Sequence, residues 1–302
     1  MQRMRRPLTL PTSRIAGDPD REILLPDSTP AVPGAAKMSY VFAARLRAAR
    51  TLLPDDAVLH GDTALWVHGV DWFTEDDSPI DVAFLRPDRI RRRPHLRVRA
   101  RSFHRDDVVD SPWGPVTSVE RTAYDIARDP LVHRSVPRLD ALARATDPLT
   151  SVRRTPRPGV VVPSPCGIDL DGVQAVVDRN PGARWIRRVH ETLALMDGGA
   201  ESPPESQLRL VVVTAGFPRL ETQIEVFDGA RFVARLDMGW REHKIGIEYD
   251  GEYHLLEAQA SKDAVRADDV RSCDWRLAQV DKERLADEGE LLQSLRRLRR
   301  DT

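Results

Sequence analysis

The sequence predicts a protein of mixed α and β structure, with two folded units after a loosely held N-terminal arm. The chain has 302 residues, which is long for a single hydrophobic core. Apolar residues alternate with polar ones in some stretches and recur at helical spacing in others, so strands and helices share each unit. A segment rich in proline, serine and threonine, "TDPLTSVRRTPRPGVVVPSPCG", separates the two regular regions and is typical of a linker. We therefore expect an N-terminal α+β unit and a C-terminal unit in which helices flank a mixed sheet.

Changes in composition along the chain mark the boundaries of the arm, the linker and the two units. Residues 1–37 are rich in proline and keep no helical or strand period, so they bury too little apolar surface to offset the entropy of ordering. We assign 38–150 to the first unit, 151–198 to a linker and helical bridge, and 199–302 to the last unit. No apolar run is long enough for a signal peptide core or a bilayer span, which predicts a cytoplasmic protein without a membrane partner. Cys166 and Cys273 lack metal-ligand spacing, so we expect neither structural zinc nor a disulfide framework.

Each element of the first unit has a local signal. "SYVFAARLRAARTLL" has helical spacing and stops at a proline, and "DDAVLHGDTALWVHGV" gives a short apolar stretch and a helix capped by Asp62 or Thr63. "IDVAFL" and "HLRVRARSF" alternate as strands. "GPVTSVERTAYDIAR" is a strand end and a helix capped by Ser118, and "VPRLDALARA" is the next helix. The bridge holds two more helices, in "DLDGVQAVVDRN" and "ARWIRRVHETLALM".

The last unit follows the order helix, three strands, helix, strand, helix. Its first helix, "ESPPESQLRLVVVTAG", has proline near the first turn and Gly216 at the stop. The strands are "RLETQIEVF", "ARFVARLDMG", "KIGIEYDG" and "WRLAQVD", and the later helices are "KDAVRADDVRSCD" and "DEGELLQSLRRLRRD".

Carboxylates interrupt the apolar strands of the central hairpin. If the apolar residues of both strands pack on one core, Met238 faces Ile245, Leu236 faces Ile247, and Trp240 to His243 form the turn. Because side chains alternate, the opposite face then holds Arg235, Asp237, Lys244, Gly246, Glu248 and Asp250. Asp237 then lies opposite Gly246 and diagonal to Glu248, roughly 5.5 to 8 Å across the pair.

Such close carboxylates repel each other unless a cation compensates them. Oxygen-only ligands suit Mg²⁺ or Mn²⁺ better than zinc. The alternative is a solvated face with ordinary surface charges, although a glycine within a strand often marks the close approach of a ligand.

The same residues carry a family resemblance. In order along roughly the last hundred residues, "ESPPESQLRLVVVTAGFPR", "RFVARLDMGWREHKIGIEYDGEYH" and "RADDVRSCDWRL" resemble actinobacterial proteins that end in a very-short-patch-repair-like endonuclease domain of the PD-(D/E)XK superfamily. The resemblance implies a restriction-endonuclease-like fold and Mg²⁺ or Mn²⁺ held by Glu205, Asp237 and Glu248. It also implies that Asp250 and His254 flank the cleft as a ligand orienter, an acid or a base.

One position departs from the superfamily pattern. Asp250 stands where a lysine usually follows the second acid by two residues, although related repair-type enzymes also lack that lysine and use histidine. Lys244 lies four residues from Glu248, roughly 13 Å along a strand, which is too far to replace it. We interpret Arg266 and Asp268 as a local charge pair or a support of the site.

The first unit contains an arginine-rich strand. In "HLRVRARSFHR", Arg97, Arg99 and Arg101 share the outward face at about 6.6 Å spacing, which suits the phosphates of an extended DNA backbone. The alternative is an edge strand that discourages aggregation. "LHGDTALWVHGV" with "GPVTSVERTAYDIAR" also resembles the middle region of type IV abortive-infection, AbiEi-like, antitoxin proteins. His60, Asp62 and His68 are residue types that often bind metals, but packing and helix capping explain their presence more simply.

Three functions remain open from the sequence. The first is a Mg²⁺-dependent endonuclease that nicks or cuts DNA and needs no small-molecule cofactor. The second is a DNA-binding regulator or antitoxin-like protein whose nuclease fold is catalytically inactive. The third is an interaction module without a nucleic-acid partner.

Overall fold

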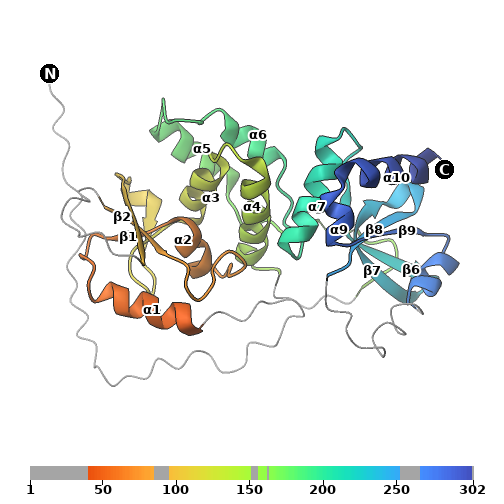
Figure 1. Ribbon diagram of the computed structural model, residues 1–302, viewed down its shortest axis with the longest axis horizontal. Coiled ribbons are helices and arrows are strands. Elements are labelled where there is room, and N and C mark those ends of the chain that lie inside the picture. Colours follow the sequence, from red (N-terminus) through yellow and green to blue (C-terminus); the bar gives the residue numbers. More distant parts are fainter. Residues whose placement is uncertain (1–39, 85–94, 151–155, 162, 252–265, 301–302) are drawn as a thin grey trace.

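The computed structural model describes residues 40–84, 95–161 except 151–155, 163–251 and 266–300. Two units lie side by side along the long axis, each with its own sheet (Figure 1). The mixed α+β architecture with helices beside each sheet confirms the predicted class. The PD-(D/E)XK topology stays an expectation from the resemblance.

The first unit contains a five-stranded sheet in the order β3-β2-β1-β5-β4. Its strands are β1 (Val58–Leu59), β2 (Ile80–Phe84), β3 (Leu96–Ala100), β4 (Val108–Val109) and β5 (Val116–Thr117). Its helices are α1 (Tyr40–Arg50), α2 (Gly61–Val67), α3 (Val119–Ala127), α4 (Val132–Thr146), α5 (Leu170–Arg179) and α6 (Arg188–Ala194). β2 is buried along its whole length, whereas β3 is the edge strand and is mostly exposed.

Two helix signals behave differently in the structure. Ser118 caps α3 as predicted, because its hydroxyl accepts the Arg121 N–H at 3.1 Å. The predicted cap of α2 at Asp62 or Thr63 is wrong, since that helix already begins at Gly61 and its N-cap residue is His60. Gly61 has a φ of +59°, and a Cβ there would lie 3.1 Å from the Asp81 carboxylate. The positive φ and this close approach favour glycine at the start of α2.

α5 and α6 pack against the first unit. Val173, Val176 and Val189 lie in the same core as the buried residues of α3 and α4. An ion-pair network around the buried Asp107 also holds α5 in place. Asp107 accepts from Arg179 of α5 and from Arg121 of α3, each at 2.7 Å. The helices in the stretch 168–196 are therefore part of the first unit's fold.

Because of the buried His60, we expect the free energy of unfolding to depend on pH. Burial, and then Arg101, lower the pKa of His60 to about 4. Between about pH 6.5 and pH 4 the His60 side chain is protonated in the unfolded chain but neutral in the folded one. The folded protein therefore loses stability as the pH falls through this range. From pH 7 to pH 5 we expect a loss of about 2 kcal/mol in the free energy of unfolding.

The comparison with His60→Gln by urea unfolding isolates this contribution. Burial raises the pKa values of Asp81 and Asp140 to about 6, so these two groups add stability as the pH falls from about 7 to 5. The wild type and His60→Gln both contain them, so their contribution cancels in the comparison. His190→Gln, at an exposed position, is the control and should keep the wild-type pH profile. Equal profiles for wild type and His60→Gln would contradict the prediction.

The second unit contains a four-stranded sheet in the order β6-β7-β8-β9. Its strands are β6 (Glu221–Asp228), β7 (Arg231–Trp240), β8 (Ile245–Tyr249) and β9 (Arg276–Val280). Its helices are α7 (Pro203–Thr214), α9 (Lys282–Ala286), α10 (Glu288–Arg300) and a segment at 266–272. β6, β7 and β8 are antiparallel neighbours, and β9 is parallel to β8. The short helix α9 was not predicted.

The predicted hairpin register is wrong by two residues. Met238 pairs with Ile247 and Trp240 with Ile245, because the turn is Arg241 to Lys244 and Trp240 still belongs to the strand. Trp240 stays in the strand because its ring is buried and stacks on Phe217. Lys244 has a φ of +47° and closes the turn in the left-handed region.

Apolar cores cover both faces of the second sheet. Neighbouring residues in a strand point to opposite faces, and on β9 Ala278 joins one core while Leu277 packs against the other. The first core includes Met238 with residues of α7 and α10, and the second includes Leu236 with Val270 of segment 266–272. Both faces of the sheet are therefore packed.

Residues 236 and 238 consequently face opposite ways, although strict alternation would put them on one face. Leu236 lies 2.5 Å from the position of a Cβ on Gly246, which confirms that it shares the face of Gly246. On β6, Gln223 has a φ of +54°, and it lies between the residues paired with Met238 and Leu236. The predicted face, on which Asp237 lies opposite Gly246 and all the polar residues of the hairpin point the same way, is wrong, because alternation breaks at Asp237 and a second core covers the side of Gly246.

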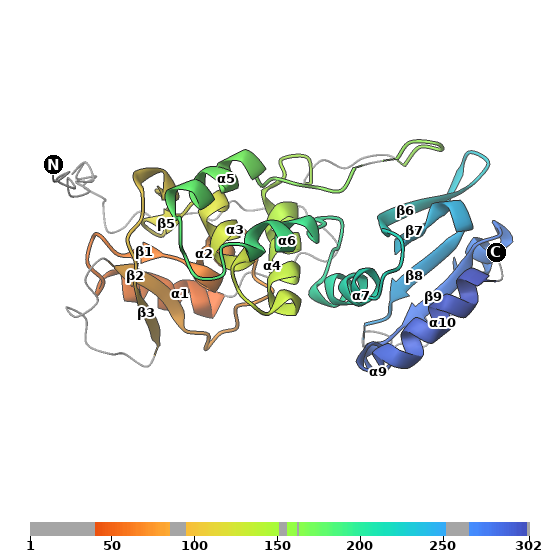
Figure 2. The same ribbon diagram turned by 90° about the horizontal axis from the view of Figure 1, so that it is seen from above.

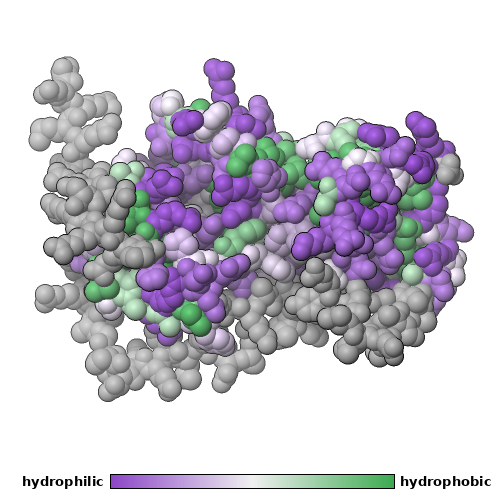
Figure 3. Space-filling model, in the orientation of Figure 1, coloured by the Kyte–Doolittle hydropathy of each residue, from purple (hydrophilic) through white to green (hydrophobic). Residues whose placement is uncertain are grey.

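Polar residues cover most of the described surface on the face shown in Figure 3, and the apolar residues there form small separate patches. All helices within the described residues are too short or too polar to cross a bilayer.

Candidate active site

Asp237 lies where β7 and β8 stop pairing. The register ends at Met238 and Ile247, and beyond it the Asp237 carboxylate accepts the backbone N–H of Tyr249 at 2.8 Å. The side chain thus takes the place of a strand carbonyl. Burial, and then the charge of Glu205, raise the pKa of Asp237 to about 7, with Glu248 and Glu201 adding to the effect. The structure therefore brings Asp237 into electrostatic contact with both of the other predicted acids.

Glu205 lies at the start of α7, as the sequence predicted. Ser202 is the N-cap residue, its hydroxyl accepts the Glu205 N–H, and it donates to the Glu205 carboxylate at 2.8 Å. The second carboxylate oxygen of Glu205 accepts the N–H of Glu201 at 2.8 Å. Glu205 is therefore the reciprocal partner of a capping interaction, a structural role that the sequence analysis missed although the S-x-x-E pattern signals it. Burial raises its pKa.

Glu248 is held from the opposite side. Arg266 donates to its carboxylate at 2.7 Å and to the Arg235 carbonyl oxygen at 2.8 Å. Since Glu248 and Gly246 are two residues apart on β8, Glu248 points toward the core that segment 266–272 covers. Asp250 follows at the end of β8, where its N–H donates to the Val280 carbonyl at 2.8 Å. His254 lies outside the described residues.

The other charges of this region are arranged as local pairs. Arg266 supports the site through Glu248, and Asp268 pairs with Arg271 at 2.8 Å, so the two do not pair with each other. Lys244 donates to Asp274 at 3.1 Å, at the opposite end of β8 from Asp250. Lys244 therefore does not reach the acids, as its sequence distance predicted.

The donor chemistry of the three acids fits a hard divalent cation. All three offer carboxylate oxygens, which Mg²⁺ and Mn²⁺ prefer, and a cation would relieve the repulsion that raises the pKa of Asp237. Within the described part of the chain, no three acidic, histidine or cysteine side chains stand together as a formed metal cage. Each acid binds a protein group instead. One carboxylate oxygen of Glu248 is already bound by Arg266.

Two residues near the acids escaped the sequence analysis. Glu201 accepts from Arg235 at 2.9 Å and also pairs with Arg144 of the first unit. Nothing in the local pattern signals Arg144, because it lies 57 residues from its partner.

The arginine strand is only partly free for DNA. Arg97 pairs with buried Asp81 at 3.0 Å, and Arg101 pairs with Asp125 at 2.5 Å. Arg99 is exposed, and no ion pair of it occurs among the described residues. β3 is also the edge strand of its sheet, which agrees with the alternative role of these arginines.

The three suspected ligands of the first unit are structural. Asp62 accepts from Arg138 at 2.8 and 3.2 Å. His68 bonds the carbonyl of Thr117 through Nε2 at 2.8 Å, and His60 is buried. These contacts agree with a structural role in packing for all three residues.

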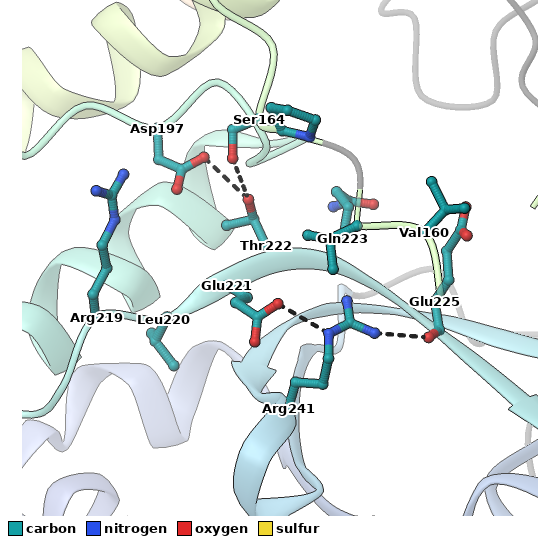
Figure 4. Close-up of a pocket in the computed structure, with 12 residues that line it drawn as sticks. Val160, Ser164, Asp197, Arg219, Leu220, Glu221, Thr222, Gln223, Glu225 and Arg241 are labelled. Atoms are coloured by element: carbon teal, nitrogen blue, oxygen red, sulfur yellow. Dashed lines mark hydrogen bonds and ion pairs between the residues drawn. The ribbon is translucent and has the colours of Figure 1, made fainter. Parts of the chain in front are cut away.

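A separate pocket of about 260 Å³ lies along the outer edge of β6. Figure 4 shows Asp197 and Ser164 directed at the hydroxyl of Thr222, and Arg241 bonded to Glu221. Asp237, Glu205 and Glu248 do not line it. We place the candidate site at the acids, because their mutual electrostatics indicate chemistry, whereas Glu221 and Thr222 of the pocket are already bonded to Arg241 and to Asp197.

Comparisons with known proteins give two relatives. The chain is similar to the uncharacterized proteins MT2308 of Mycobacterium tuberculosis strain CDC 1551 / Oshkosh and Rv2248 of strain ATCC 25618 / H37Rv, each 28% identical over 109 residues. The match covers 36% of this chain and only 40% of each relative. No family model matches the chain. No solved structure matches it.

Proposed function

We propose that the protein is a metal-dependent endonuclease that hydrolyses phosphodiester bonds of DNA and uses Mg²⁺ or Mn²⁺. One observation carries the proposal: the partly buried Asp237 stands at the point where two strands separate, and Glu205 and Glu248 are near enough to raise its pKa. Buried carboxylates that raise one another's pKa are common at functional sites.

The chain's own residues have separate tasks in this proposal. Asp237, Glu248 and Glu205 would hold the cation, and the Tyr249 N–H and the Ser202 hydroxyl orient two of them. When bound, the ion would activate a water molecule and neutralise charge on the phosphate. Arg266 is the cation beside Glu248, and on release it could bind a phosphate oxygen.

A second candidate is a DNA-binding regulator with an inactive nuclease fold. It is favoured by the protein partners that each acid already has and by Asp250 in the place of the usual lysine. In this case the acids stabilise α7 and the joint between β8 and segment 266–272.

Nicking of supercoiled plasmid separates the two candidates. The full chain should nick in Mg²⁺ or Mn²⁺ and stop when a chelator removes the ion. Salt-sensitive DNA binding without cleavage would favour the regulator, and neither binding nor cleavage would contradict both.

Arg99 tests whether the first unit holds the DNA. We expect Arg99→Glu to weaken binding to a short duplex about tenfold and to lower the salt slope by about 1, because one phosphate contact is lost. Fluorescence anisotropy over a series of salt concentrations measures both quantities. Arg134→Glu is the matched control on α4, where the side chain is exposed and its nearest carboxylate partner is 3.9 Å away. An equal effect of both variants would remove the predicted DNA track.

A further inference from the structure

Glu201 connects the first unit to the acids of the second. Its carboxylate pairs with Arg144 of α4 and accepts from Arg235 of β7 at 2.9 Å. Its N–H donates to Glu205 at 2.8 Å. Arg235 lies two residues before Asp237, and Glu205 is the helical acid of the candidate site. One residue thus contacts both elements that supply acids, and a side chain of the other unit holds it.

A second ion pair fixes α4 against α7. Arg209 donates to Asp140 at 2.9 Å and to the Leu195 carbonyl at 2.6 Å, and both charged side chains are buried. Asp140 lies one helical turn before Arg144, and Arg209 lies one turn after Glu205. Figures 1 and 2 show α4 and α7 side by side between the two sheets. The two pairs have opposite polarity, because α4 supplies the base Arg144 to one pair and the acid Asp140 to the other.

The pairing also affects the charge balance at the acids. Glu201 adds a negative charge beside Glu205 and Asp237, whereas Arg144 favours the ionised form of Glu205. The Arg144 side chain is about one fifth exposed, at 22%, so solvent screens this interaction only partly.

We propose that Arg144 is a positioning residue for the acid site: it fixes Glu201, and through Glu201 it sets β7 and the start of α7. The site of the second unit is then complete only with the first unit docked against it. This inference rests on the proposed nuclease function, and it gives the first unit a role beyond contact with DNA.

Steady-state nicking by the full-length protein tests the proposal. We expect Arg144→Gln to lower kcat about tenfold to a hundredfold, because small misplacements of reacting groups have effects of that size. KM for the plasmid should stay within about twofold, since Arg144 is not expected to touch substrate. Arg144→Lys should recover most of the rate, and Arg134→Gln on the same helix should match the wild type.

A double-mutant cycle supplies the specific readout. Glu201→Gln should lower kcat as Arg144→Gln does, and the double variant should lose no more than either single variant, because both act through one contact. Additive losses, an unchanged kcat in Arg144→Gln, or a raised KM with normal kcat would overturn the inference. If the wild-type protein does not nick DNA at all, the proposed function fails and this inference with it. A wild-type enzyme that nicks normally beside an equally active Arg144→Gln contradicts the inference alone.

Discussion

Asp237→Asn should abolish nicking while the protein stays folded. We expect kcat to fall roughly a thousandfold, because metal-ion stabilisation is worth several kcal/mol and each factor of ten corresponds to about 1.4 kcal/mol. Asparagine is nearly isosteric with aspartate, and its carbonyl oxygen can still accept the Tyr249 N–H that Asp237 accepts at 2.8 Å. The plasmid assay in Mg²⁺ measures this loss.

The same substitution should stabilise the fold. Because the pKa of Asp237 is raised to about 7, its ionised form is disfavoured in the folded protein, and stability is lost as the pH rises from the unfolded value of about 4 through 7. A neutral asparagine removes this loss, so the free energy of unfolding at pH 8 should rise by an amount on the order of 2 kcal/mol. Less activity with more stability is typical of an active-site acid.

Asp274→Asn is the matched control for Asp237→Asn. Its side chain is 86% exposed and pairs with Lys244 away from the acids, so activity and stability should both stay near wild type. A wild-type rate in Asp237→Asn would mean that the nicking comes from another site or from a contaminant. Loss of activity with loss of stability would assign Asp237 to the fold alone.

Arg209→Met should produce the largest loss of stability. The change leaves Asp140 buried and without its charged partner, and removing one member of a buried pair costs about 3 to 5 kcal/mol. Asp140 is fully buried, and its pKa is already raised to about 6 by burial in the presence of Arg209. Without Arg209 its folded pKa rises further, so the loss should be largest at pH 8 and smaller at pH 5, where the protonated form is favoured. Urea unfolding at both pH values measures this.

Two variants check the cause of that loss. Adding Asp140→Asn to Arg209→Met should restore part of the stability, because no buried charge remains. Arg231→Met, whose side chain is 58% exposed and pairs with Asp228 at 3.3 Å, should lose less than about 1 kcal/mol. Equal losses for the two arginine variants would show that the pair between the units does not stabilise the protein.

Features that depend on neighbours along the chain could be predicted before the fold was known. Alternation and helical spacing predicted most helices and all strands except β4, and the cap of α3 at Ser118 and the stop of α7 at Gly216 also follow from local backbone preferences. The sequence also singled out Asp237 and Glu248, because acids within apolar strands are conspicuous, whereas Glu205 was named only through the family resemblance. Their roles as metal ligands came from a resemblance and stay a prediction.

The arrangement of these acids depends on how distant parts of the chain pack together. A period of two assumes a regular strand, but packing on both faces of the sheet turns Leu236 and Met238 to opposite sides and places Asp237 at the break. The buried Trp240 lengthens β7 and shifts the hairpin register. The partners of Glu248 and Glu201 lie 18 and 57 residues away. Such contacts depend on how whole elements pack, and that information is absent from any local stretch of sequence.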